Sequence, residues 1–390
     1  MKSTKLFRLL ILFVLINIMP TGSLFSQSAW ISEVLEYKPA PGQFTDNTNT
    51  VESLKNTIVG GNDGGLVSLG AFGGNVVFKF DHKINNVVGF DLAIYGNSFV
   101  ANSQGHDLGS CEPGIVYVSQ DLNSNGVHDS DETWYELAGS EYYKPTTKHN
   151  YKVTYFRPSV GEDTHLIKYR IEYNGVTTDT VLDLTVIKSF HPQHMYPDWY
   201  DTSITFEGTI IESNTVIYGG LYSNAPYDWG YVDNRGYENK SGDLQGADVF
   251  DISWAVDSLG KKIDLKYIDF VKVQTATQEV AGWLGDRSTE ILGAADYSML
   301  NTAAPLSALS VDNGRFAIYP NPTSNSFNIK SNSLIKEINI YSLSGGLVKT
   351  IKVSRTKNVF VEVADLVKGI YLIRIIDVND NSFVKKLSVI

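Results

Sequence analysis

Residues 167–173 read IKYRIEY, in which each apolar side chain before the last is followed by a charged one. This period of two is the pattern of a β-strand with one buried and one solvated face. Similar short runs occur at residues 76–80, 115–118 and 268–273, separated by Gly, Asn, Asp and Pro, and helical periodicity is nearly absent. We therefore predict an all-β chain whose main domain is a jelly-roll-like β-sandwich, which pairs two sheets face to face.

The sequence divides into four predicted parts. Residues 1–28 have the pattern of a signal peptide, because three basic residues precede an apolar run, Leu9–Met19, that is too short to span a bilayer. Residues 299–315 are small, polar and aperiodic, which predicts a linker. A passenger domain then spans residues 29–298, and residues 316–390 form a small immunoglobulin-like β-sandwich. We expect no transmembrane segment.

Charge and cysteine content restrict the classes of function. The net charge is −11, but residues 316–390 carry ten Lys or Arg against five Asp or Glu, and residues 1–8 carry three basic residues. The net charge of residues 9–315 is therefore −19, which argues against nucleic acid as a partner, because a basic surface supplies most of that affinity. The single cysteine, Cys111, allows no intrachain disulfide, so an exported chain needs a large core or a bound metal.

Residues 121–132 read DLNSNGVHDSDE and match the calcium-loop pattern D-x-[DN]-x-[DN]-G-x₅-E at every position. Carboxylate, amide and carbonyl oxygens are the ligands that Ca²⁺ prefers. The predicted ligands are Asp121, Asn123, Asn125, the carbonyl of Val127, Asp129 and Glu132. The flanking residues have strand character, so we expect a structural calcium site without the moving helices of a sensor. The alternative is a solvated acidic turn without metal.

Several ordered motifs mark the C-terminal tail: YPNP at residues 319–322, INIY followed by a Gly-Gly turn, GIYLI at 369–373 and a final Lys-Lys pair. The tail resembles the type A sorting domain of the type IX secretion system over about its last 75 residues. The resemblance implies recognition by an outer-membrane translocon, passage through the periplasm to the surface or the medium, and removal of the tail with release or with attachment to lipopolysaccharide. The implied signal residues are Tyr319, Pro320, Asn321, Pro322, Gly369, Tyr371, Lys385 and Lys386. The alternative is an ordinary immunoglobulin-like accessory module.

The passenger carries a second resemblance. Its stretches GFDLAIYGNSF, CEPGIVYVSQDLNSNG, TWYELAGSE, DWGYVDN, FDISWAVD and IDFVKV, continuing to GWLGDRSTEI, are similar to a poorly characterised family of Bacteroidota cell-surface proteins. The resemblance implies a role at the cell surface and an association with nutrient uptake, with cobalamin as one candidate nutrient. It transfers no catalytic residues.

Two aromatic loops, residues 191–200 and 222–237, place ring faces beside carboxylates, which suits a sugar or another flat amphipathic ligand. The predicted ligand-binding residues are Tyr196, Trp199, Tyr200, Tyr227, Trp229 and Tyr231. We therefore expect a noncatalytic protein that binds a glycan or a small nutrient. One alternative is a glycosidase-like hydrolase using two carboxylates among Glu112, Glu136, Glu141, Asp248, Asp251, Glu290 and Asp296. Another is a structural or adhesive surface protein.

Overall fold

The computed structural model describes residues 27–45, 51–54, 56–103, 106–235, 246–300, 316–342, 347–378 and 382–389. Almost all of the predicted signal peptide and of the predicted linker lies outside these residues. In the described part, helices are short, and none is long and apolar enough to cross a bilayer. The predicted all-β fold is confirmed.

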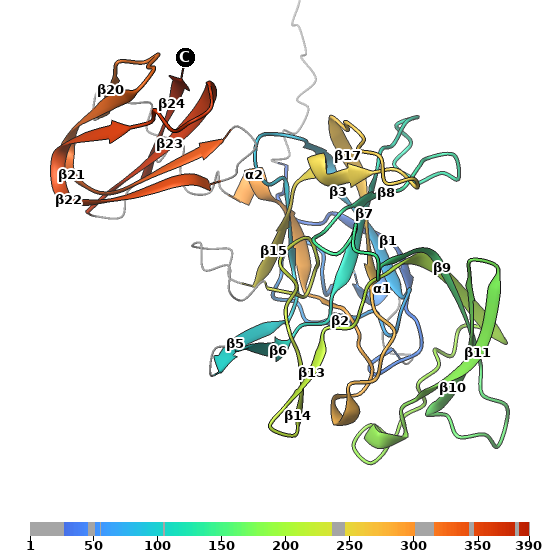
Figure 1. Ribbon diagram of the computed structural model, residues 1–390. Coiled ribbons are helices and arrows are strands. Elements are labelled where there is room, and N and C mark those ends of the chain that lie inside the picture. The colour runs from blue at the N-terminus through green and yellow to red at the C-terminus, as the bar shows by residue number, and fades with distance from the viewer. Residues whose placement is uncertain are drawn as a thin grey trace, which may run out of the picture.

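A six-stranded antiparallel sheet forms one layer of the passenger (Figure 1). Its strands, in order across the sheet, are β1 (Glu33–Lys38), β3 (Asn75–Asn85), β17 (Tyr267–Thr275), β7 (Gly114–Ser119), β8 (Tyr135–Leu137) and β16 (Ala255–Val256). Strand alternation decides which side chains enter the core. Val271 and Val273 of β17 are fully buried in it, whereas Lys272 lies on the opposite face, directly across from Val77 and Tyr117.

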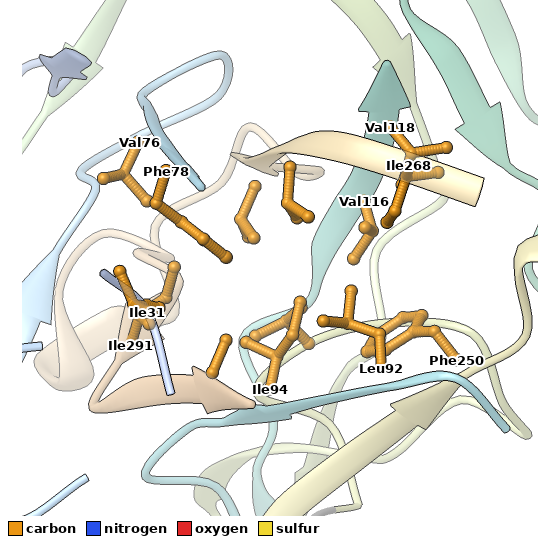
Figure 2. Packing of buried hydrophobic residues seen from close by; sticks show 14 of the residues in the cluster. Ile31, Val76, Phe78, Leu92, Ile94, Val116, Val118, Phe250, Ile268 and Ile291 are labelled. Carbon is orange, nitrogen blue, oxygen red and sulfur yellow. The ribbon is translucent and has the colours of Figure 1, made fainter. Parts of the chain in front are cut away.

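A three-stranded sheet forms the second layer, with the order β15 (Ala247–Phe250), β4 (Leu92–Tyr95) and β19 (Gly293–Asp296). Figure 2 shows the main core between the two layers, where Leu92 and Ile94 of β4 and Phe250 of β15 face Val116 and Val118 of β7. Burying each such side chain stabilises the fold by about 1.5–3 kcal/mol. A core of this size compensates for the absence of disulfides.

Further strands extend the passenger beyond this sandwich. One sheet has the order β11 (Val176–Asp183), β10 (Leu166–Tyr173), β9 (Lys148–Phe156) and β12 (Ser203–Ile210). Another has the order β13 (Thr215–Tyr218), β14 (Leu221–Asn224), β6 (His106–Ser110) and β5 (Phe99–Ser103), and β18 (Glu290–Ile291) pairs with β2 (Val67–Ser68). The short helices are α1 (Val51–Leu54), α2 (Tyr297–Leu300), η1 (Thr185–Ile187), η3 (Ile252–Trp254) and η4 (Gly282–Leu284).

Strand β10 contains the IKYRIEY stretch, and its predicted alternation is confirmed. Ile167 is fully buried, whereas Lys168 and Arg170 on the other face are exposed. The strand turns into β11 through Asn174 and Gly175, both at positive φ, +49° and +75°. A two-residue Asn-Gly turn with this geometry matches the twist of the strands that it joins.

The tail has its own strands and its own hydrophobic cluster. The strands are β20 (Phe316–Tyr319), β21 (Ser326–Ser342), β22 (Leu347–Glu362), β23 (Gly369–Asp377) and β24 (Ser382–Val389). Strand β21 is irregular between Lys330 and Ile335; its first part pairs with β20 and β22, and its second part with β22 and β23. Apolar residues of all five strands, among them Phe327 and Ile373, form the buried cluster. This arrangement agrees with the predicted small β-sandwich.

Candidate functional site

The predicted calcium loop connects two neighbouring strands of the large sheet. Strands β7 and β8 pair antiparallel through Tyr117 opposite Glu136 and Val118 opposite Tyr135, and residues 120–134 join them. The predicted strand flanks of the loop are thus confirmed. Because both strands belong to the packed sheet, the two ends of the loop are held at a fixed separation.

Hydrogen bonds inside the loop fold it around its acidic ends. The Asp121 carboxylate accepts from the backbone N–H of Asn125 (3.1 Å) and of Gly126 (2.7 Å), and Gly126 has a φ of +77° that favours glycine. The Glu132 carboxylate accepts from the N–H of Leu122 (2.7 Å) and of Asp129 (2.9 Å). Asp121 and Glu132 are both buried, so the first and last predicted ligands close the loop from opposite ends.

Asn123, Asn125 and Asp129, three of the remaining predicted ligands, contact one another. The side-chain amides of Asn123 and Asn125 both donate to Oδ2 of Asp129, each at 2.7 Å. The loop therefore gathers three carboxylates, two amides and the Val127 carbonyl within twelve residues. This donor set consists of hard oxygen atoms, the type of ligand that Ca²⁺ prefers.

Contacts with the sheet fix the outside of the loop. The N–H of Asp121 donates to Oδ2 of Asp269 on β17 (2.8 Å), and Nζ of Lys79 on β3 donates to the Gly126 carbonyl (2.8 Å). The His128 ring stacks on Trp134, with centroids 4.2 Å apart and planes at 17°. The loop conformation is thereby linked to the position of Trp134 at the start of β8.

A groove of about 540 Å³ lies beside the loop, on the face of the large sheet opposite the core. The loop residues Val127 and His128 form one wall together with Trp134, and Phe206 on β12 lies on another side. Most of the remaining lining is polar, supplied by Glu36, Lys38, Asn75, Thr205, Glu207, Lys272 and Gln274. The groove therefore offers many hydrogen-bonding groups beside apolar surface.

A smaller cavity of about 170 Å³ shares Trp134, Glu207 and Lys272 with the groove, so the two adjoin. It also contains Glu136, whose carboxylate accepts from the Thr209 hydroxyl at 2.6 Å. Burial raises the pKa of Glu136 to about 8, and burial lowers the pKa of Lys272 to about 8. Glu136 in the smaller cavity and Lys272 at its boundary with the groove thus both have a pKa of about 8.

The six aromatic residues predicted to bind ligand separate into two groups. Tyr200 contacts both Tyr196 and Trp199, Tyr227 contacts Tyr231, and Trp229 contacts Trp254; among the described residues, no ring contact joins the two loops. Tyr196, Tyr227 and Tyr231 are buried, while Trp199 is 40% and Trp229 47% exposed. The buried tyrosines pack in hydrophobic clusters. Amino-acid composition alone could not distinguish these packing roles from an exposed platform.

A second acidic site lies in the passenger interior, where carboxylate oxygens of Glu112, Asp233 and Glu290 are all within 4.8 Å of one another. Asp233 has a φ of +56°; its Oδ1 accepts from the N–H of Asn97 (2.9 Å) and of Ser98 (2.7 Å), and its Oδ2 from that of Glu290 (3.0 Å). Glu112 and Glu290 were among the predicted hydrolase carboxylates, whereas Asp233 was missed. No motif marks it, because its partners are distant in sequence.

Burial and mutual proximity keep these carboxyls protonated at higher pH than usual. Burial raises the pKa of Glu112 to about 7, although the positive charge of Arg287 opposes the shift. Burial also raises the pKa values of Asp233 and Glu290 well above their ordinary range, and the negative charge of Glu112 adds to both shifts. The cluster therefore keeps its protons to higher pH than isolated carboxyl groups would. Burial likewise raises the pKa of the Cys111 thiol, which disfavours the reactive thiolate.

We predict that, with divalent cations chelated, the unfolding free energy of the protein falls as pH rises from about 5 to 8. These carboxyl groups have a higher pKa in the folded protein than in the unfolded one, so the unfolded state binds fewer protons between about pH 5 and 8. A rise in pH across this range therefore favours unfolding. Each unit of raised pKa corresponds to about 1.4 kcal/mol. Thermal melts of wild type, Glu112→Gln and the exposed control Asp228→Asn measure the effect. The glutamine variant should have a shallower pH dependence than both, and parallel curves for all three proteins would contradict the prediction.

In the tail, the predicted sorting residues occupy defined positions. The side-chain oxygen of Asn321 in the YPNP segment accepts from the N–H of Ser388 on β24 (2.9 Å), which ties the segment to the end of the domain. Gly369 begins β23, Lys385 and Lys386 lie on β24, and the buried Tyr371 donates its hydroxyl to the Val367 carbonyl (2.6 Å). The motifs are thus parts of one folded unit.

Comparison with known families supports the assignment of the tail. Residues 317–390 match the family described as a secretion system C-terminal sorting domain. No curated protein matches the chain. The match identifies a type IX sorting domain and shows that the protein is exported to the cell surface or the medium.

We predict that deletion of residues 316–390 leaves the passenger folded but retained in the periplasm. The tail has its own hydrophobic cluster, so its removal takes no side chain from the passenger core. Cell fractionation with immunoblotting of medium, outer surface and periplasm measures the effect. Normal amounts of truncated protein in the medium or on the surface would contradict the prediction.

Proposed function

We propose that the protein is a calcium-stabilised binding protein that holds a glycan or another small polar nutrient at the surface of a bacterium of the Bacteroidota type. The observation that carries the proposal is the groove whose wall is formed by Val127 and His128 of the acidic loop. A cation held by the loop oxygens would stabilise that wall. The exported passenger would be released, or joined to lipopolysaccharide after removal of the tail.

The chemistry of the groove favours a polyhydroxylated ligand. Carboxylates accept hydrogen bonds from hydroxyl groups, amides both donate and accept, and ammonium groups donate. The groove combines all three kinds, with a few apolar side chains that can cover the hydrophobic face of a sugar ring. Its volume lies within the range of small-molecule sites. A corrinoid, the candidate implied by the passenger resemblance, is the second ligand class to test.

Calcium should raise the melting temperature of the protein. With dissociation constants of about 10⁻⁴ to 10⁻³ M, as in extracellular modules, 10 mM calcium adds about 1.4 to 2.7 kcal/mol of stability. We expect a rise of roughly 3 to 10 °C relative to chelator in thermal melts. Asp121→Ala and Glu132→Ala should abolish the rise, whereas the control Asp131→Ala, at an exposed position of the same loop outside the ligand set, should keep it. Identical thermal melting curves of the wild type with calcium and with chelator would contradict the proposed calcium site.

The binding proposal is tested by screening the protein against glycan arrays and corrinoids in calcium and in chelator. Val127→Trp should weaken binding at least about tenfold, because Val127 is exposed and its enlarged side chain would fill the groove without removing a calcium oxygen. Leu122→Trp is the matched control, since Leu122 is equally part of the loop and exposed but does not line the groove. Detectable binding that both variants retain unchanged would place the ligand elsewhere.

Trp199 and Trp229, the two exposed tryptophans of the predicted aromatic set, are a secondary candidate surface. Alanine variants of each separate the two sites. Loss of ligand with a nearly unchanged melting temperature would favour this surface over the groove.

One observation favours a hydrolase as a second candidate function. Glu136 and Glu207 line the same small cavity, and burial keeps Glu136 protonated at neutral pH, as a general acid requires. Assays for released reducing sugar, with Glu136→Gln as control, decide between binding and turnover. Turnover that Glu136→Gln abolishes would establish catalysis at this cavity.

A further inference from the structure

Lys272 places its ammonium group where the two cavities adjoin. Its strand, β17, is central in the large sheet, and its side chain lies across from Tyr117 on the groove face. The ammonium lies over the ring of Tyr117 (4.4 Å to the centroid) and over that of Trp134 (4.9 Å). Among the described residues it has no recorded hydrogen bond or ion pair. Aromatic faces attract a cation, but they leave the three N–H donors of an ammonium without directed acceptors.

The charges around Lys272 do not compensate for its burial. Burial lowers the pKa of Lys272 to about 8 even though Glu36 and Glu136 act in the opposite direction, and Lys38 adds to the lowering. A partly desolvated ammonium in this condition gains from an additional anionic partner.

Two further features define the class of ligand. Trp134 is covered by His128 on one side and contacts Lys272, so it positions the lysine more than it offers a free stacking face. Glu36 and Glu207 also line the groove and would repel a ligand with many negative charges. Lys272 and Lys38 offset Glu36 and Glu207 in the groove, so a ligand with a single negative charge is favoured over one with many, and hydroxyl groups suit the neighbouring carboxylates and amides.

We propose that the ligand is an acidic sugar whose single monovalent oxyanion, a uronic-acid carboxylate or a sulfate ester, binds Lys272, while its hydroxyl groups bind the polar side chains that line the groove. The inference rests on the proposed binding function and names the ligand class of that groove. Glu36 and Glu207 repel extended polyanions. The sugar units next to the anionic one are therefore neutral.

The test uses a glycan array printed in matched pairs, probed with the full exported protein in calcium at pH 6.5. Each acidic oligosaccharide is paired with its carboxyl-reduced or desulfated counterpart, and a long polyuronate is included. We expect acidic members with one anionic group to bind about 10- to 100-fold more tightly than their neutral partners, as for a hydrogen bond to a charged group. The polyuronate should bind more weakly than these oligosaccharides.

Two lysine variants make the test specific. Lys272→Gln should remove the preference for the acidic member of each pair without lowering the melting temperature, because it removes a poorly compensated buried charge. Lys148→Gln is the control, since Lys148 also lies over two aromatic rings but lines neither cavity. Lys272→Arg keeps the charge and should retain part of the preference.

The outcomes separate this inference from the function on which it rests. Equal binding of acidic and neutral members, or tightest binding of the polyuronate, would overturn the acidic-sugar inference and leave the glycan-binding proposal standing. Absence of binding to every pair would overturn both. A preference for acidic members that Lys272→Gln retains would assign the anion to another group and refute the role of Lys272.

Discussion

The pairing of β7 with β17 and β8 is the constraint on which the candidate sites depend. Every residue of β7 from Gly114 to Ser119 is buried, and the strand is hydrogen-bonded on both sides. Glu112 of the buried carboxylate cluster precedes it, Tyr117 in its middle faces Lys272, and Asp121 of the acidic loop follows it. One rigid strand therefore sets the positions of three chemically different sites.

The same arrangement connects stability with recognition. With a single, buried cysteine, the chain depends on core packing and on closure of its longer loops. In the proposed account, a cation at residues 121–132 closes the loop between β7 and β8, and the loop supplies a wall of the groove. Calcium would then act on ligand affinity through the position of Val127 and through the stack of His128 on Trp134. The carboxylate cluster takes no part in this coupling. It affects the stability of the fold through the pH at which its carboxyl groups lose their protons.

Local sequence patterns predicted the structural features that are determined by residues close together in the chain. The alternation of IKYRIEY is observed in β10, the twelve consecutive residues of the loop revealed its donor set, and ordered motifs marked the tail. The groove and the carboxylate cluster could not be predicted, because tertiary pairing assembles them from segments as distant as Glu36 and Gln274. Lys272, a charged residue between the buried Val271 and Val273 of β17, was the available signal for the groove. Burial of Tyr196, Tyr227 and Tyr231 depends on packing that ring composition does not encode.

The central claim is that the loop between β7 and β8 holds calcium and thereby forms the wall of a binding groove. The most direct test is an anomalous difference map from crystals of the protein grown in millimolar calcium, with data collected at a wavelength where calcium scatters anomalously. The account predicts a peak enclosed by Asp121, Asn123, Asn125, the Val127 carbonyl, Asp129 and Glu132. A map in which the loop is ordered as described and contains no such peak would contradict it.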